Sequence, residues 1–397
     1  MPSRRSVLVA GLAAAGLTVA GPIVRRTVGA RLSARTERRL NQVADAGPYL
    51  VPPAAADLHE HLTVVDLHAD TLLWGRDLLA RANQGHVDVP RMIEGNLALE
   101  VFAASTHVPR HLNYDRNDDR TDDIRLVAIV QGWPRPSWRS RVARAEHLAR
   151  RLHEAAERSD GRLRVIRSAA DLDAVLTARA TGQTVVGGLL AIEGAHALDG
   201  DLANLDRLEA AGYRMVGLAH FFDNSFAGSA HGIAKGGLTG AGRDLVGELE
   251  RRQMLVDVAH CSAATVDDVL SVATRPVVAS HTGVRAVADN DRNLTDEQLR
   301  GMAATGGIIG IGFWPTASGG EDATSIARSI AHAVAVVGAG HVALGSDFDG
   351  AVPVPFDASG MVVLTAALLA HGLDEASIAS VMGRSAIRLL REALPPT

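Results

Sequence analysis

Apolar runs of strand length alternate with amphipathic stretches of helix length along most of the chain. The predicted strands are residues 62–67, 97–104, 185–192, 214–219, 254–259, 276–280, 307–313 and 342–346. The predicted helices are residues 138–158, 201–211, 242–252, 263–272, 296–304 and 324–337, followed by 361–371 and 374–394. The strands are continuous apolar runs, which is typical of strands buried on both faces of a parallel sheet.

About eight strand–helix units in one domain predict an α/β fold, the (β/α)8 or TIM barrel. An open, doubly wound sheet is the alternative. Polar residues at the ends of many separate strands favour the barrel, because active sites of barrels are built from those ends. No Gly-rich phosphate loop follows the first strand, as a dinucleotide-binding sheet would require.

The domain organisation follows from the same pattern. Residues 61–397 predict one barrel domain without internal repeats, and the polar insertion at 109–139 predicts a loop over the barrel mouth. Residues 31–60 predict a linker with a short helix at 32–46, ahead of Pro52-Pro53.

Residues 1–30 predict a targeting segment. Arg4-Arg5 precedes an apolar stretch at 7–20, which resembles a twin-arginine export signal and predicts a periplasmic, extracellular or membrane-anchored protein. A membrane-spanning helix needs about 20 apolar residues, and this stretch is shorter. No clear cleavage site follows, so an uncleaved membrane anchor stays open, as does a disordered Ala-rich N-terminus.

Composition narrows the classes of function. The chain has 397 residues, of which 47% are hydrophobic, and a formal net charge of -5, so no basic face indicates a nucleic-acid partner. Cys261 is the one cysteine, which excludes an intrachain disulfide and a cysteine-based zinc site. A small buried hydrophobe is favoured over a reactive thiol at this position.

Metal-ligating side chains end the predicted strands. They are His68, Asp70, Glu193, His220, His260, His281 and Asp347. A lone histidine is more often a packed core or surface residue than a ligand. Because the carboxyl ends of barrel strands converge, this set predicts a metal site.

The donors exceed what one zinc ion needs, and a bridging carboxylate between two ions uses them economically. Lys235, the single lysine, lies in a Gly-rich loop and not at a strand end, so a carboxylated lysine cannot be the bridge. Glu193 is then the natural bridge. Two cations with a bridging hydroxide favour attack of water on a polarised carbonyl, which predicts a metal-dependent hydrolase.

Several motifs carry a family resemblance. They lie at 65–71 (Val-Asp-Leu-His-Ala-Asp-Thr), 192–194, 254–262, 280–281, 291–296 and 345–350. In this order, and over about residues 62 to 392, the chain resembles the membrane dipeptidase (renal dipeptidase) family of zinc peptidases, a branch of the amidohydrolase-type barrels.

The resemblance implies roles for the site residues. His68 and Asp70 would bind one zinc, His260 and His281 the other, and Glu193 would bridge both. His220 would contact the scissile carbonyl oxygen and stabilise the oxyanion. Arg292 would hold the C-terminal carboxylate of a small peptide substrate, although a surface ion pair with Asp291 or Asp296 is the structural alternative. Asp347 would orient the hydroxide and pass its proton to the leaving amine.

The resemblance also suggests a homodimer, but some positions depart from the family pattern. An asparagine expected early in the C-terminal helix is absent at 383–385, and the segments before Arg292 and after His220 also differ. These departures leave the predicted ligands intact and affect the expected substrate pocket.

Two other functions compete with a dipeptidase. A related amidohydrolase would act on lactams or N-acyl amino acids with the same chemistry. A non-catalytic exported binding protein would be expected to lose ligands or the general base, and here each of those positions is filled.

Overall fold

The computed structural model describes residues 22–397, and the twin-arginine-like segment at 3–20 lies outside them. The strands are β1 Val64–Ala69, β2 Leu97–Ser105, β3 Leu163–Ile166, β4 Val186–Glu193, β5 Tyr213–Gly217, β6 Leu255–Asp257, β7 Val278–Thr282, β8 Ile308–Ile311 and β9 Val342–Leu344. The helices before β6 are α1 Pro22–Leu40, α2 Pro53–Glu60, α3 Val89–Glu94, α4 Asp123–Val130, α5 Arg141–Arg158, α6 Ala169–Ala180, α7 Leu205–Ala210 and α8 Gly240–Arg251. The later helices are α9 Ala263–Val272, α10 Asp296–Ala304, α11 Pro315–Ser318, α12 Ala323–Val337, α13 Met361–Ala370, α14 Glu375–Ala379 and α15 Ser385–Ala393.

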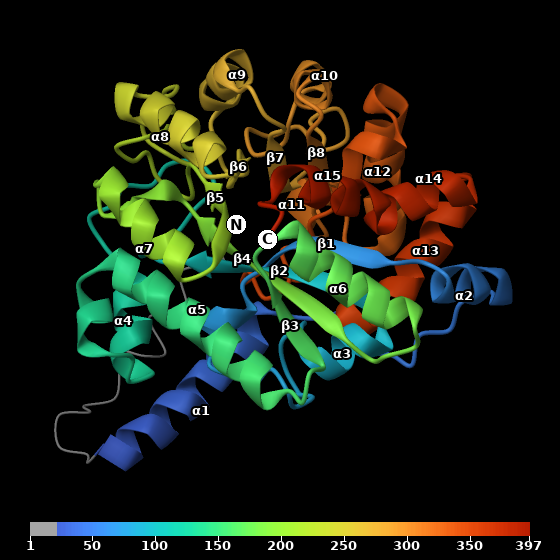
Figure 1. Cartoon of the computed structure of the whole chain (residues 1–397), viewed down its shortest axis with the longest axis horizontal. Helices are drawn as coiled ribbons and strands as arrows, with labels where there is room; N and C mark the ends of the chain where they lie inside the picture. Colours follow the sequence, from blue (N-terminus) through green and yellow to red (C-terminus); the bar gives the residue numbers. More distant parts are fainter. Residues whose placement is uncertain (1–21) are drawn as a thin grey trace.

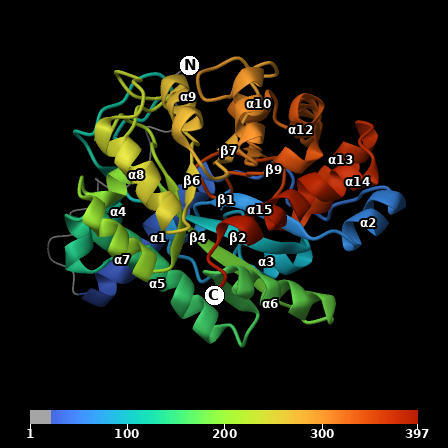
Figure 2. The same cartoon turned by 45° about the horizontal axis from the view of Figure 1, so that its top comes forward.

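The strands close into a parallel barrel, as the sequence predicts. Pairing runs β2-β1-β9-β8-β7-β6-β5-β4, and an additional pairing of β2 with β4 completes the ring. Helices surround the strands on the outside (Figures 1 and 2). The fold is therefore a (β/α)8 TIM barrel, in which the carboxyl ends of all the strands meet at one mouth.

The short strand β3 was not predicted. It pairs with the first half of β4, while β5 pairs with the second half, so β3 lies outside the ring. Its sequence, Leu-Arg-Val-Ile, is short and its middle two residues are half-exposed, so it lacks the continuous apolar run of the barrel strands. Gly187 permits the crowding there, because a Cβ atom at this position would lie 2.5 Å from the Ile166 side chain.

Side-chain caps fix where many helices begin. The capping residues, whose side chains accept a hydrogen bond from a backbone N–H of the first turn, include Asp88, Asp122, Ser140, Ser168, Thr239, Ser262, Thr295, Asp322 and Asp374. These caps satisfy amide groups that have no partner inside the helix. The predicted helices at 263–272 and 296–304 are confirmed to the residue.

The C-terminal helix predicted over 374–394 is instead three segments. A π-helical turn, Ser380–Arg384, separates α14 from α15. Its Gly383 packs onto the chain just before β1, where a Cβ atom would lie 1.9 Å from the carbonyl oxygen of Thr63. Any larger residue at Gly383 would collide with the backbone before β1.

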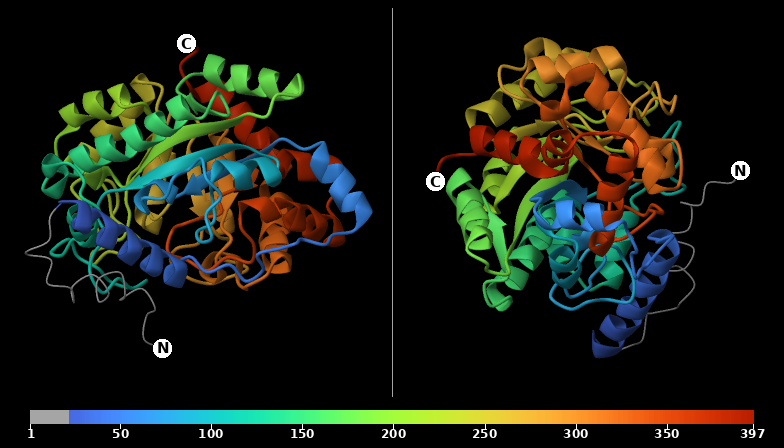
Figure 3. Two further views of the ribbon diagram at one scale, coloured as in Figure 1. Left: turned by 90° about the horizontal axis from the view of Figure 1, so that it is seen from below. Right: turned by 90° about the vertical axis from the view of Figure 1, so that its right-hand side faces the viewer.

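The predictions for residues 32–46 and for residues 109–139 also need correction. The helix expected over 32–46 is α1, Pro22–Leu40, and it packs beside α4 on the barrel (Figure 3). The insertion at 109–139 is not a simple loop, because it contains α4 and a 3-10 turn at Arg135–Trp138. Within the described part of the chain, no helix is both long and apolar enough to cross a membrane.

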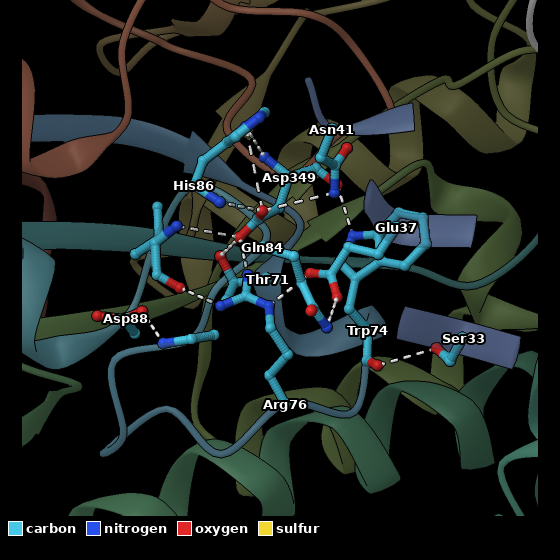
Figure 4. A network of polar contacts seen from close by, with 12 residues as sticks. Ser33, Glu37, Asn41, Thr71, Trp74, Arg76, Gln84, His86, Asp88 and Asp349 are labelled. Carbon is cyan, nitrogen blue, oxygen red and sulfur yellow. Dashed lines mark hydrogen bonds and ion pairs between the residues drawn. The ribbon is translucent and has the colours of Figure 1, made fainter. Parts of the chain in front are cut away.

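A buried ion network attaches α1 to the barrel (Figure 4). Arg76 lies between two carboxylates, with Nε 2.5 Å from Glu37 Oε1 and Nη2 2.5 Å from Asp349 Oδ2. Burial raises the pKa of Glu37 to about 7, against the opposing effect of Arg76. The guanidinium therefore holds together two carboxylates that are out of contact with water.

We expect Arg76→Met to destabilise the protein by about 3–5 kcal/mol, because it leaves two buried carboxylates without their cation. Urea unfolding followed by circular dichroism measures this loss. Arg81→Met is the control, because the Arg81–Glu94 ion pair is largely exposed and worth under about 1 kcal/mol. Equal losses in the two variants would contradict the importance of the network.

Candidate metal centre

The carboxylate of Glu193 is surrounded by imidazoles. Its Oε1 lies 3.1 Å from His260 Nε2, 3.5 Å from His68 Nε2 and 3.6 Å from His281 Nε2. Its Oε2 lies 3.2 Å from His220 Nε2. All five side chains are buried. Glu193 is therefore the point where the predicted site residues converge.

The barrel brings these residues together from separate strands. His68 lies in β1, and Asp70 directly follows that strand. Glu193 ends β4, His220 follows β5 and His260 follows β6. His281 lies in β7, and Asp347 follows β9. Asp70 Oδ2 is 3.7 Å from His68 Nε2. Since the strands are parallel, every one of these positions is at the same end of the barrel.

The donor set fits divalent metal ions. The described residues include three groups with ligand atoms within 4.8 Å of one another: His68, Glu193 and His281; Glu193, His220 and His260; and His68, Asp70 and Asp347. The Nε2 atoms of His260 and His281 are 2.9 Å apart, and buried His68 Nε2 has no hydrogen-bond partner in the described structure. Converging imidazole nitrogens and carboxylate oxygens are donors that a divalent metal ion binds.

Burial controls the protonation of this cluster. It raises the pKa of Glu193 well above its usual value, with the nearby charge of Asp70 acting in the same direction. It lowers the pKa of His260 well below its usual value, assisted by the positive charge of Arg292. His260 is therefore neutral at physiological pH and keeps a nitrogen lone pair for a metal.

Ser280 and Asp257 orient His281 from behind. Ser280 Oγ donates a hydrogen bond to Asp257 Oδ2 at 2.6 Å and lies 2.9 Å from His281 Nδ1. Because the single hydroxyl proton goes to Asp257, the oxygen can only accept from His281. The proton of His281 then resides on Nδ1, which leaves Nε2 open toward Glu193.

Two site residues have left-handed backbone conformations. His260 has φ +62° and Asp347 has φ +61°, values that cost about 1–3 kcal/mol for residues other than glycine. The loop of Asp347 is held by Ser346, whose N–H donates to Asp66 Oδ1 at 2.8 Å and whose hydroxyl accepts from Phe348 N–H at 2.9 Å. These bonds fix the turn that presents Asp347.

Arg292 is buried beside the cluster. Its Nη2 donates to the carbonyl oxygen of His281 at 2.5 Å, and its guanidinium lies 5.6 Å from the centre of the Trp314 ring. The predicted alternative of a surface ion pair is wrong, because Asp291 binds Lys235 at 2.8 Å and Asp296 binds His332 at 2.8 Å. Its Nε has no hydrogen-bond partner among the described residues.

A pocket opens above the cluster and encloses about 670 Å³ of space, part of it open to solvent. Asp70, Glu193, His220, His260, Arg292 and Asp347 contribute its polar lining. Its apolar wall includes Leu40, Leu73, Trp74, Val108, Leu112 and Ile124. An apolar wall facing a few convergent polar groups suits a small molecule.

Two other predictions concern residues outside the cluster. Cys261 is buried, and burial raises the pKa of its thiol far above the usual range, so it is a packed side chain and not a nucleophile. Lys235 pairs with Asp291 away from Glu193, so it is no bridging ligand.

Sequence reasoning missed the supporting residues Asp66, Asp257 and Ser280. A signal existed for the two aspartates, since each interrupts an otherwise apolar strand two or three residues before a predicted ligand. Ser280 offered no such signal, because serine is common in any element.

Comparisons with known proteins identify the family. Residues 53–394 match the family described as membrane dipeptidase (peptidase family M19). Dipeptidase tcpJ of Claviceps purpurea is 30% identical over 317 residues, which cover 78% of this chain and 69% of that protein.

Solved structures lead to the same family. A crystal structure of the dipeptidase AC, a metallopeptidase of family M19, superimposes with a TM-score of 0.69 at 28% identity, covering 84% of this chain and 99% of that one. A metallopeptidase from Rhodobacter sphaeroides, liganded with a phosphinate mimic of the dipeptide L-Ala-D-Ala, gives a TM-score of 0.68 at 29% identity with the same coverage.

We expect Ser280→Ala to weaken zinc binding about ten- to a hundredfold, because His281 loses the partner that fixes its tautomer. Competition between the metal-free protein and a chromogenic chelator measures the affinity. Ser329→Ala is the matched control, since Ser329 is equally buried but donates to the carbonyl oxygen of Ser318 in another part of the barrel. An unchanged affinity in Ser280→Ala would remove the orienting role.

Proposed function

The chain belongs to the membrane dipeptidase family, peptidase family M19, and is a metallopeptidase; we propose that it hydrolyses the peptide bond of dipeptides with two zinc ions bound around Glu193. The convergence of four imidazoles on this one buried carboxylate carries the proposal. The phosphinate mimic of L-Ala-D-Ala on the Rhodobacter sphaeroides relative supports a dipeptide as the substrate class.

The proposed ligand sets divide the cluster between two metals. Following the family resemblance, His68 and Asp70 would hold one zinc, His260 and His281 the other, and Glu193, which lies within 3.6 Å of His68 and His260, would be shared. When bound, the ions would supply a hydroxide nucleophile at neutral pH and positive charge beside the scissile carbonyl.

Arg292 binds the substrate in this proposal. Its guanidinium is buried against Trp314, and burial lowers its pKa although it stays charged at physiological pH. A dipeptide with a free C-terminal carboxylate provides an anion for this cation, and the planar fork can bind it through two hydrogen bonds.

His220 and Asp347 handle the charge and the proton. His220 lies beside Glu193 and lines the pocket, where a ring N–H can donate to the oxygen of the scissile carbonyl as negative charge develops on it. Asp347 also lines the pocket, where its carboxylate can take a proton from the attacking water and deliver it to the leaving amine.

The cellular location is a separate proposal that rests on residues 1–30. The paired arginines and the apolar stretch after them support export by a twin-arginine-type pathway. The same stretch makes a membrane anchor a further proposal, and the family resemblance makes a homodimer another.

We expect purified protein to contain about two zinc ions per chain and to lose dipeptide hydrolysis on chelation, because the buried donors need cations. Elemental analysis and an assay on the same sample, before and after zinc is restored, test this. Undiminished hydrolysis after complete metal removal would refute the metal mechanism. Activity on lactams or N-acyl amino acids in place of dipeptides would instead indicate the alternative amidohydrolase function.

We expect Arg292→Lys to lower kcat/KM for a dipeptide roughly 30- to 1,000-fold, because lysine cannot form two parallel hydrogen bonds to a carboxylate. This corresponds to a loss of about 2–4 kcal/mol of transition-state stabilisation. An amidated dipeptide should be a similarly poor substrate of the unchanged protein. Arg285→Lys is the control, since Arg285 precedes Arg292 on the same loop but is 40% exposed and pairs with Asp289. Equal cleavage of free and amidated dipeptides would exclude carboxylate binding by Arg292.

A further inference from the structure

The chain has an N-terminal strap, residues 33–44, that lies outside the family match at 53–394. It comprises the end of α1 and the extended residues after it. Its buried positions, Ser33, Glu37, Leu40 and Asn41, follow the helical spacing of one face. That face lies against the barrel mouth and not against solvent.

Buried polar contacts hold the strap to the loop that carries Asp347 (Figure 4). Glu37 binds Arg76, which binds Asp349. Asn41 Oδ1 accepts from Ala351 N–H at 2.8 Å. Glu37 Oε2 also accepts from Gln84 Nε2 at 3.2 Å.

Backbone hydrogen bonds continue the attachment. Val43 bridges Val354 in parallel, Ala44 N–H donates to Val354 O at 3.0 Å, and Val354 N–H donates to Gln42 O at 2.9 Å. Contacts before Leu40 and contacts after it thus fix the strap, which leaves the side chain of Leu40 little freedom to move.

Leu40 is part of the pocket itself. It lines the apolar wall together with Leu73 and Trp74, which follow β1, and Val108 and Leu112, which follow β2. In the ring order, β2 is four strands from β7 in either direction. Arg292 follows β7, so Val108 and Leu112 lie across the mouth from Arg292, and Leu40 lines the pocket together with them.

We propose that Leu40 of the strap closes the compartment for the side chain of the substrate's first residue and limits its size. This inference rests on the proposed dipeptidase function. A dipeptide with its carboxylate on Arg292 and its peptide bond over Glu193 must extend its first residue toward the opposite wall. There the side chain meets an apolar surface that the strap completes.

Substitutions at Leu40 test this through substrate preference. The measured quantity is the ratio of kcat/KM for L-Phe-L-Ala to kcat/KM for L-Ala-L-Ala. Leu40→Ala should raise this ratio about tenfold by enlarging the compartment, and Leu40→Phe should lower it by a similar factor. A purely structural role would change both substrates equally and leave the ratio unchanged.

Arg39→Ala is the matched control, because Arg39 is the neighbouring residue of α1 and is exposed. It should leave the ratio unchanged. If the unchanged protein cleaves no dipeptide, the proposed function fails. If it cleaves both substrates and neither Leu40 variant changes the ratio, the inference about the strap is overturned while the function stands.

Discussion

The buried carboxylate of Glu193 is the constraint on which the rest of the site depends. An ionised carboxylate out of contact with water is costly unless cations or hydrogen-bond donors compensate its charge. Among its four imidazole neighbours, His260 cannot do so, because burial lowers the pKa of His260 and favours its neutral form. Divalent cations resolve this conflict, since neutral imidazoles and a carboxylate are their ligands. The desolvation that makes this cluster costly without a cation is therefore what would favour a bound metal ion.

The barrel supplies the geometry but not the orientation of each side chain. Strand ends bring the ligands to one mouth, yet His260 and Asp347 reach the centre only through left-handed turns. These strained conformations persist because neighbouring groups determine them, as Ser346 does for Asp347. The Asp257–Ser280 pair performs the same task for His281. The strained loop conformations thus lower the stability of the fold, and hydrogen bonds to the strands compensate for this loss.

The sequence was most informative where an ionisable residue interrupts an apolar pattern. His68, Glu193 and His281 could be recognised because ionisable residues at the ends of buried strands have few structural explanations. The strand β3 escaped recognition because it is short and its middle two residues are half-exposed. Contacts between distant segments were equally invisible, since Asn41 and Asp349 are 308 positions apart and the sequence around each gives no sign of the other. Local periodicity predicts elements, whereas such partners are selected by the closed fold.

Two aspartates of one loop show how environment assigns function. Asp349 accepts hydrogen bonds from Thr71 and Arg76, and its partners hold its pKa below the usual range although burial alone would raise it. Such a carboxylate is a fixed anion that anchors the strap and cannot exchange a proton near neutral pH. Asp347, two residues earlier, lines the same pocket but keeps a small exposed fraction that substrate and water can reach, whereas Asp349 is fully buried. Asp349 is therefore structural. Its fixed charge holds the loop that positions Asp347, the acid suited to proton transfer.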